Sequence, residues 1–362
     1  MNEKEKRFTQ VCIKLDELRF KKPIDQGGIN IKGIKPSEEI FLFWLCSIID
    51  QFYPYQTIWE NGKKAMLNIL KTNPKSFDDV KKTMRNIRKD RKGNFVADIP
   101  TDNENTFTLV RDDFERIEKT FNFLSTYEND KNENIPFRFI KLLGNCILKF
   151  QGNGGIRKLA YYLNSCLWES SPDESFPENE IIKFLDKPRK RLWMFIMFLR
   201  RDPFLLNLFR DALIEVYGEL EGKKIFSIWE NNEKFDPKEI ELPGDMWNIR
   251  LFQYLKISSK NAKKKARELA SEFGVSPSIF DVTFAIGAEK CKEGGCDEWL
   301  NCPFGDNKVC HKGKEKFCSV AQWLFEDNKI LCDPENCPIG RNLGRKMCQE
   351  SKNKRLTDYY SK

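Results

Sequence analysis

Eight of the twelve cysteines lie in one stretch near the carboxyl end of this 362-residue chain. Cysteine thiolates can share a metal centre when short, flexible spacers let several sulfurs converge. The spacing divides the eight into two sets of four, C-x4-C-x5-C-x7-C and C-x13-C-x4-C-x10-C. The first set is Cys291, Cys296, Cys302 and Cys310, and the second is Cys318, Cys332, Cys337 and Cys348. The pattern predicts metal ligation at one or two centres.

Two features of this stretch favour iron over zinc. Two of the cysteines are followed by proline, which is common around iron–sulfur clusters. The spacing also lacks the paired C-x2-C knuckles that are typical of zinc ribbons. We therefore expect a [4Fe–4S] cluster, with zinc as the alternative, and the spacing leaves open which four cysteines bind together. His311 directly follows Cys310 and is interpreted as a loop residue.

The composition predicts a globular protein in a reducing compartment. Hydrophobic residues make up 40% of the chain, with 29 Phe and 8 Trp, which is sufficient for a sizeable core. The first residues, MNEKEKRFTQ, lack the apolar stretch of a signal peptide, and no apolar run of about 18 residues predicts a membrane span. We expect a cytoplasmic protein, in which clustered cysteines bind metal rather than form disulfides. The net charge of +8 is compatible with a polyanionic partner.

Mostly helical elements must position these residues. Apolar residues recur at helical spacing in five segments. These segments cover residues 36–71, 112–127, 135–150, 180–201 and 203–220. Alternation predicts only a short pair of strands, near 93–99 and 106–112. The four cysteines upstream of the cluster lie among apolar residues and are expected to be buried in the core. They are Cys12, Cys46, Cys146 and Cys166.

Four segments resemble, in their order along the chain, the helix-hairpin-helix superfamily of DNA glycosylases, and in particular its endonuclease III class. FLFWLCSIIDQFYPYQTIW is similar to the early core helix and the turn after it, and FLDKPRKRLWMFIMFLRR to the hairpin and a second apolar helix. In LPGDMWNIRLFQYL, Asp245 and Arg250 occupy the positions of a Pro-flanked Asp and of the Arg five residues later. SPSIFDVTFAIGAEKC is similar to the helix that leads into the cluster loop. The four segments lie within about residues 38–310.

The resemblance implies a mostly α, two-lobed glycosylase-like fold with a Cys-rich, metal-binding extension at the carboxyl end. It implies that Asp245 is catalytic, where it would stabilise positive charge on the sugar of a flipped nucleoside or activate water. Pro-Gly-Asp ahead of an apolar helix also suits a helix N-cap, so a structural role for Asp245 stays open. Lys190 lies where the bifunctional enzymes carry a Schiff-base lysine, with Arg191 competing for the position. The family hairpin has a glycine-rich turn that approaches a DNA phosphate, whereas residues 187–190 contain no glycine.

Basic residues at two places are candidates for phosphate contact. The segment KPRKR could bind phosphates by displacing condensed counterions, and KISSKNAKKKARELASEFG predicts a basic helix whose start could receive a phosphate. A solvated charged face is the alternative for both. The DNA-binding candidates are Lys187, Arg189, Lys190, Arg191, Arg250, Lys263 and Lys264. A third cationic stretch, DDVKKTMRNIRKDRKGN, is interpreted as a surface loop or helix end.

The last residues, NKRLTDYYSK, have the spacing of a sliding-clamp-binding peptide, Gln-x-x-Leu-x-x followed by two aromatic residues. That spacing places the leucine and aromatic anchors on one side of a short helical turn. The candidate clamp-binding residues are Asn353, Leu356, Tyr359 and Tyr360, with asparagine in place of the usual glutamine.

We therefore expect a helical body over residues 1–290 with the hairpin at about 181–200, a metal-binding loop over 291–348, and a flexible tail over 349–362. The whole is interpreted as a monomeric, nucleoid-associated DNA-repair protein that binds double-stranded DNA and a sliding clamp and excises a damaged or modified base. One alternative is a non-catalytic DNA-binding or scaffold relative of the glycosylases. Another is a zinc-stabilised RNA-binding protein.

Overall fold

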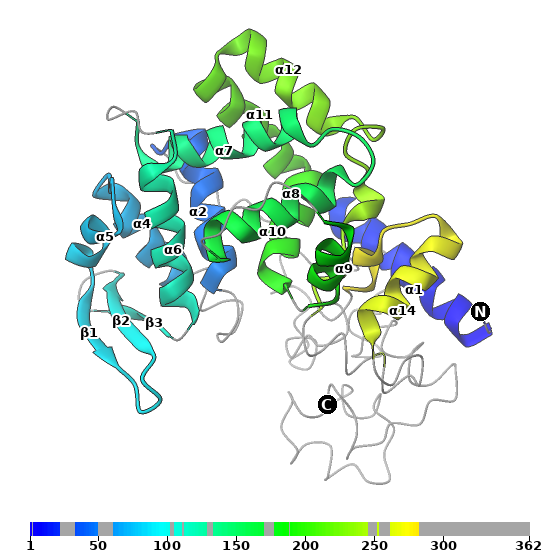
Figure 1. Ribbon diagram of the computed structural model, residues 1–362, viewed down its shortest axis with the longest axis horizontal. Coiled ribbons are helices and arrows are strands. Elements are labelled where there is room, and N and C mark those ends of the chain that lie inside the picture. The colour runs from blue at the N-terminus through cyan, green and yellow to red at the C-terminus, as the bar shows by residue number, and fades with distance from the viewer. Residues whose placement is uncertain are drawn as a thin grey trace, which may run out of the picture. The chain divides into compact units, whose positions relative to one another are not determined.

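The computed structural model describes residues 1, 3–21, 33–49, 61–101, 105–110, 112–128, 133–169, 177–187, 189–244, 252 and 261–281. These residues form helices and one small sheet, which confirms the expectation of a mostly α protein (Figure 1). They divide into two compact units. The first unit is Met1–Asp25, Pro188–Lys190 and Ile240–Lys362, and the second is Gln26–Lys187 and Arg191–Glu239.

Helix α2 (Pro36–Ile49) is the buried centre of the second unit. It begins at Pro-Ser-Glu-Glu, as expected, and twelve of its fourteen residues are buried. A helix that is apolar on every side must be covered on every side. The helices that pack against α2 are α4 (Lys63–Lys71), α6 (Asp112–Thr126), α7 (Ile135–Lys149) and α11 (Pro203–Tyr217). The single segment predicted over 36–71 is thus two helices, α2 and α4.

Aromatic side chains fill the space around α2. Trp44 stacks on Trp168 with ring centroids 5.3 Å apart, and meets Phe195 edge to face at 5.0 Å. Trp168 belongs to η2 (Ser165–Glu169), a π-helical turn that continues α8 (Gly155–Asn164), and Phe195 belongs to α10 (Lys190–Arg201). Such pairs stabilise by about 0.5–1.5 kcal/mol beyond the area they bury.

The other predicted helices and the buried cysteines are also confirmed. Segments 112–127 and 135–150 are α6 and α7, and 180–201 contains α9 (Glu178–Asp186) and α10. Helix α11 ends before Gly218, after which α12 (Glu219–Glu230) returns along it. The upstream cysteines are all buried thiols outside disulfides, and burial raises the pKa of the Cys12 thiol. They are Cys12, Cys46, Cys146 and Cys166.

A three-stranded antiparallel sheet follows α5 (Phe77–Thr83). Its strands are β1 (Arg85–Lys89), β2 (Phe95–Pro100) and β3 (Thr106–Leu109), in the order β1-β2-β3. The predicted strand pair is confirmed as β2 and β3, whereas β1 lies in the stretch that was interpreted as a loop or helix end. All five residues of β1 are exposed. Alternation of apolar and polar residues indicates a strand with one buried face. Strand β1 has no buried face, so its sequence does not alternate in this way.

The first unit joins α1 (Glu3–Lys21) to segments from the far end of the described chain. These are α14 (Ala262–Phe273) and the short turn η4 (Pro277–Phe280). The ring of Phe8 stacks on Phe280 at 5.6 Å and meets Phe252 edge to face at 5.5 Å. An ion pair of 2.8 Å between Lys265 and Glu5 links α14 to α1.

Candidate nucleic-acid interface

Most of the residues predicted from the sequence to act in catalysis, metal binding or clamp binding lie outside the described residues. They are Asp245, Arg250, Cys291, Cys296, Cys302, Cys310, Cys318, Cys332, Cys337, Cys348, Asn353, Leu356, Tyr359 and Tyr360. The structure describes the basic candidates at 187–191 and at 263–264, and some of them are exposed whereas others are buried.

Three residues of the predicted hairpin run lie at the break between two helices. Helix α9 ends at Asp186, and Lys187 follows with an extended backbone and an exposed side chain, as the position before a proline favours. Arg189 and Lys190 are half-buried, and Lys190 is the first residue of α10. The break between α9 and α10 thus lies within the segment at about 181–200 that was expected to hold the hairpin.

Arg191 is buried and takes part in an ion pair. Its guanidinium is 3% exposed, and Nη2 donates a hydrogen bond to Oδ1 of Asp113, a fully buried carboxylate on α6. A buried guanidinium in such a pair cannot also reach a solvated phosphate. Arg191 was predicted to contact DNA because it belongs to a charged run, and its position at the start of an apolar helix turns it toward the core instead.

Helix α14 separates its two candidate lysines in the same way. Lys263 is 4% exposed, and its side chain lies over Gly244, where an added Cβ would be 3.2 Å from Cδ. Lys264 is exposed. The helix begins after Asn261, whose side chain accepts a hydrogen bond from the Lys264 main-chain N–H, rather than at the serines upstream. Lys263 is thus covered by neighbouring atoms, whereas Lys264 is exposed, and phosphate contact by either lysine stays a prediction.

A glycine-rich turn outside the predicted candidate sites binds an anionic side chain. It joins α7 to α8, and Gly152 and Gly154 have φ values of 98° and 75°. The N–H of Gly154 donates to Glu239 Oε1 at 2.6 Å, and the N–H of Ile156 donates to Glu239 Oε2 at 2.9 Å. Glu239 comes from η3 (Pro237–Glu239), and burial raises the pKa of its carboxyl group against the effect of these hydrogen bonds. The turn thus holds a carboxylate on main-chain donors, as a helix N-terminus favours.

The cationic stretch 81–92 forms the end of α5 and most of a β-hairpin. Lys81 and Lys82 pair with Asp78 and Asp79 of the same helix. The hairpin itself carries five basic residues and a single acidic one between positions 85 and 95. The basic residues are Arg85, Arg88, Lys89, Arg91 and Lys92, and all five are exposed.

The loop of the hairpin is held by one aspartate. The carboxylate of Asp90 accepts hydrogen bonds from the N–H groups of Lys92 at 2.8 Å and Asn94 at 3.0 Å. Gly93 has a φ of 82°, as expected for a three-residue hairpin loop that closes through a left-handed residue. Arg91 and Lys92 therefore lie at an ordered tip, which projects away from α5 and α6 in Figure 1.

Asp98 of β2 holds β1 in place at a bulge. The register advances three residues on β1 for two on β2, and Asn86 in the extra position has a φ of 51°. Asp98 Oδ2 accepts hydrogen bonds from Arg88 Nη1 at 2.9 Å and Asn86 Nδ2 at 3.1 Å, and its Oδ1 accepts one from Thr108 at 2.7 Å. Burial opposes ionisation of this group, but the three hydrogen bonds outweigh it and hold the pKa of Asp98 below its ordinary value.

Replacing Asp98 with asparagine should lower the free energy of unfolding by about 1–2 kcal/mol, because charge-assisted hydrogen bonds weaken. The folded pKa lies below the unfolded one, so this contribution is present above about pH 4 and is lost as the pH falls through the folded pKa. Urea unfolding of the two proteins should show a gap at pH 7 that closes in acid. Asp78→Asn, which removes an exposed carboxylate on α5, is the control with an expected effect within about 0.5 kcal/mol. A gap that widens in acid would contradict the assignment.

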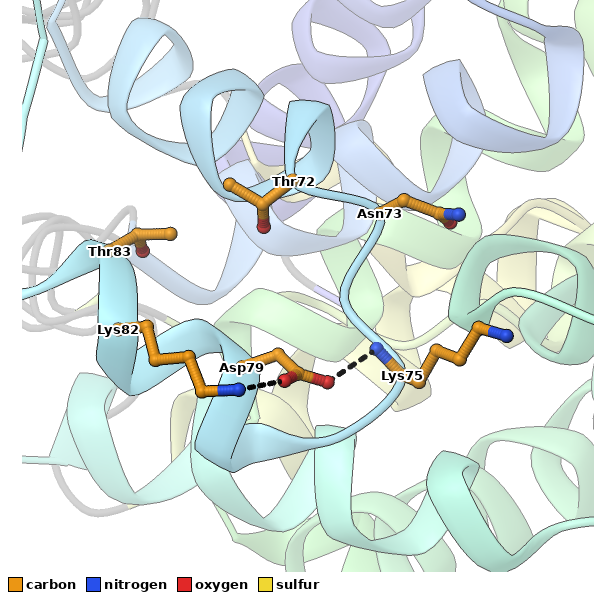
Figure 2. A pocket seen from close by; sticks show the side chains of 6 residues that line it. All are labelled: Thr72, Asn73, Lys75, Asp79, Lys82 and Thr83. Carbon is orange, nitrogen blue, oxygen red and sulfur yellow. Dashed lines mark hydrogen bonds and ion pairs between the residues drawn. The ribbon is translucent and has the colours of Figure 1, made fainter.

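A polar hollow of about 450 Å³ lies where α4 turns into α5 (Figure 2). Its lining residues are Thr72, Asn73, Lys75, Asp79, Lys82 and Thr83. Asp79 is engaged by Lys82 Nζ at 2.7 Å and by the main-chain N–H of Lys75 at 3.1 Å, and these contacts lower its pKa to about 2.

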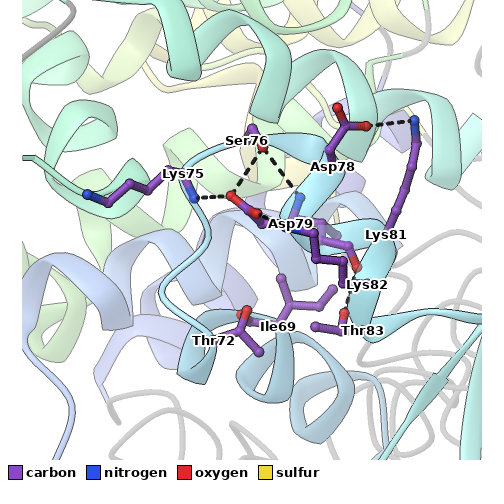
Figure 3. A network of polar contacts seen from close by, with 10 residues as sticks. Ile69, Thr72, Lys75, Ser76, Asp78, Asp79, Lys81, Lys82 and Thr83 are labelled. Carbon is purple, nitrogen blue, oxygen red and sulfur yellow. Dashed lines mark hydrogen bonds and ion pairs between the residues drawn. The ribbon is translucent and has the colours of Figure 1, made fainter. Parts of the chain in front are cut away.

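The contacts in this hollow belong to a helix cap. Ser76 is the N-cap of α5, where its Oγ accepts a hydrogen bond from the Asp79 N–H and donates one to the Asp79 carboxylate (Figure 3). Reciprocal capping of this kind stabilises the first turn of a helix. The charged and polar groups that line the hollow therefore cap the first turn of α5. Helix α5 leads through Met84 into the hairpin.

Comparison with protein-family models, with curated proteins and with solved structures finds no match for this chain. Across the described ranges, no helix is both long enough and apolar enough to cross a membrane. No three His, Cys, Asp or Glu side chains are grouped to hold a metal ion in those ranges, and the eight cysteines expected to do so lie beyond them.

Proposed function

We propose that this protein binds double-stranded DNA and acts as an iron–sulfur relative of the DNA glycosylases, excising a damaged or modified base. The observation that carries the proposal is the glycine turn between α7 and α8, which holds a carboxylate on the N–H groups of Gly154 and Ile156. A phosphate oxygen carries the same charge and accepts the same hydrogen bonds.

The turn between α7 and α8 contains glycines and main-chain N–H donors, whereas the predicted hairpin at 187–190 contains no glycine. The resemblance implies a helix–turn–helix whose glycines let main-chain N–H groups approach a DNA phosphate, and residues 187–190 contain none. Helix α7, the turn at 150–154 and helix α8 have these features. A Cβ on Gly155 would come within 2.7 Å of the Phe150 carbonyl oxygen, so glycine is required there by close approach of the backbone. DNA would bind this turn in place of the Glu239 carboxylate.

The chemistry is proposed on Asp245. An ionised carboxylate beside a flipped nucleoside stabilises the positive charge that develops on the sugar or activates a water molecule. Lys190, half-buried at the start of α10, is the candidate nucleophile for strand cleavage. Four of the eight cysteines from Cys291 to Cys348 would hold a [4Fe–4S] cluster, and the other four leave room for a second centre. The part of the metal would be to anchor the chain around the DNA-binding residues.

Excision and binding are measured separately to test the proposal. Purified protein should bind a 20–30 base-pair duplex with an affinity that falls as salt rises, and should release a base from one member of a lesion panel. Asp245→Asn should reduce single-turnover excision by about 100-fold or more while leaving duplex affinity unchanged. Binding without excision on the panel would assign the chain to the non-catalytic relatives, and absence of duplex binding would overturn the proposal.

The identity of the metal and the role of the carboxyl-terminal tail are tested by separate measurements. An anaerobic preparation should absorb near 400 nm and contain about four iron atoms per cluster, whereas a colourless protein with about one zinc per four cysteines would select zinc. Deleting residues 353–362 should remove binding to a sliding clamp and leave duplex affinity unchanged. Clamp binding that survives the deletion would exclude the tail as the docking peptide.

A further inference from the structure

We infer that the β1–β2 hairpin is a second DNA-binding element, a two-stranded ribbon that enters the major groove of duplex DNA. The inference rests on the proposed function, because it takes duplex DNA as the ligand, but it assigns a surface to which neither the sequence nor the glycosylase resemblance points. Four observations carry it: the pairing state of the cations, the exposed apolar side chains, the ordered tip and the dimensions of the ribbon.

Four of the five hairpin cations have no acidic partner among the described residues, in contrast to the lysines of α12. On α12, Lys223 pairs with Glu219 and Lys224 pairs with Glu221. Within the described residues, no carboxylate lies at ion-pair distance from the basic groups of the hairpin other than Arg88. Those groups are Arg85, Lys89, Arg91 and Lys92, and the only acid among them, Asp90, is engaged by the N–H groups of the loop. Unneutralised charge concentrated on one element is what releases counterions from a phosphate backbone.

The hairpin also exposes two large apolar side chains beside its basic residues. Ile87 is 43% exposed and Phe95 is 40% exposed, and they are two of the five large apolar side chains that are exposed in the described part of the chain. The Phe95 ring stacks on Phe114 of α6 at 5.4 Å and lies 5.0 Å from Lys89 Nζ. Phe95 therefore anchors the hairpin to the helices, whereas Ile87 is open to a ligand. Apolar contacts with thymine methyl groups are one means of reading the major groove.

The shape of the element fits this groove. Strand β3 pairs with β2 from Ala97 to Pro100, so the hairpin is two-stranded from the Arg88–Val96 pair to the tip. Paired strands lie about 4.8 Å apart, and the major groove of B-form DNA, about 12 Å wide, admits a two-stranded ribbon. The strands are joined by a closed loop, and the Asp98 network ties β1 to β2 and β3. The major groove of A-form RNA is deep and narrow, so the same ribbon favours duplex DNA over duplex RNA.

Two full-length variants with the same loss of charge test the inference. Arg85→Gln, Arg91→Gln and Lys92→Gln are combined in the hairpin variant, and Lys183→Gln, Lys223→Gln and Lys224→Gln, on α9 and α12, in the control. Affinity for a 20-base-pair DNA duplex is measured from 50 to 300 mM salt, with circular dichroism to verify folding. The hairpin variant should lose about tenfold or more in affinity, and the slope of log K against log salt should fall by about 2–3, while the control changes the slope by less than about 1.

Ile87→Ser separates groove contact from charge alone. It should weaken duplex binding about two- to fivefold without changing the salt slope, because no phosphate contact is lost. Equal losses in the hairpin and control variants, an unchanged hairpin slope, or tighter binding to an RNA duplex of the same sequence would overturn the inference while the proposed function stands. Failure of the unaltered protein to bind any DNA duplex would instead overturn the proposed function.

Discussion

Replacing Asp113 with alanine should lower the free energy of unfolding by about 3–5 kcal/mol, because it leaves the Arg191 guanidinium buried without its counter-charge. Both side chains are inaccessible, at 4% and 0% exposure, and α6 and α10 meet at this pair. The Oδ2 atom of Asp113 accepts no hydrogen bond from the described residues. The pair is thus closely coupled and incompletely satisfied, so that removal of one partner costs more than removal of both.

A double variant distinguishes this cause from a simple loss of packing. Asp113→Leu with Arg191→Met replaces the pair by apolar groups, and its stability should lie within about 1–2 kcal/mol of the unaltered protein. Chemical denaturation of the single and double variants provides the comparison. A double variant as unstable as the sum of the two single ones would show that the two residues do not act as a pair.

The same pair predicts a pH dependence. Burial raises the pKa of Asp113 to about 6, although the Arg191 charge acts in the opposite direction. The folded pKa lies above the unfolded value of about 3.9, so the contribution of this group is fully present below about pH 4 and is lost as the pH rises through about 6. The stability difference between the unaltered protein and Asp113→Asn should therefore change between pH 4 and 6, and unfolding measured at intervals across that range would reveal it.

Gly222→Ala should destabilise the protein by about 3 kcal/mol, although alanine is the better helix former. Propensity alone predicts a gain of up to about 1 kcal/mol for this change in the middle of α12. A Cβ at this position would lie 2.7 Å from the Ile214 Cα and N atoms and from the Leu213 carbonyl oxygen, all of them main-chain atoms of α11. The two helices would have to separate, with a loss of packing along their contact.

The adjacent residue supplies the control for this prediction. Lys223→Ala changes an exposed side chain of α12 that forms an ion pair with Glu219, and its expected effect is within about 0.5 kcal/mol. Thermal and urea unfolding of the two variants should differ clearly in midpoint. A stabilised Gly222→Ala protein would show that α11 and α12 are further apart than the structure has them.

Helix positions were predictable because each helix has a periodic apolar face or, for α2, an uninterrupted one. Pro36 and Asn134 mark the starts of α2 and α7, and Gly218 the end of α11, where local capping chemistry decides the boundary. Strand β1 was missed because its residues are all exposed. The signal that could have revealed it is the tip sequence Asp-Arg-Lys-Gly-Asn ahead of the predicted strand at 93–99.

The candidate site shows where reasoning from a charged run fails. Lys187 and Arg191 are four residues apart in one basic segment, yet the first is exposed and the second is buried against Asp113. Lys263 and Lys264 are neighbours with the same difference. Lys187 lies before α10 on an extended backbone, whereas Arg191 lies in the first turn of that helix. Lys263 and Lys264 differ because rotation about a helix axis separates consecutive residues by about 100°.

Composition and pattern by themselves determined that the chain is mostly helical, that its upstream cysteines are buried, and where its principal helices lie. These properties depend on local spacing and on the transfer of apolar side chains out of water. Only the tertiary structure decided that Glu239 occupies the glycine turn, that Asp113 neutralises Arg191, and that four of the five hairpin cations have no acidic partner among the described residues. Such pairings join residues 78 or more positions apart, or depend on the absence of any neighbour, and the free energy of a charge is set by what surrounds it in space.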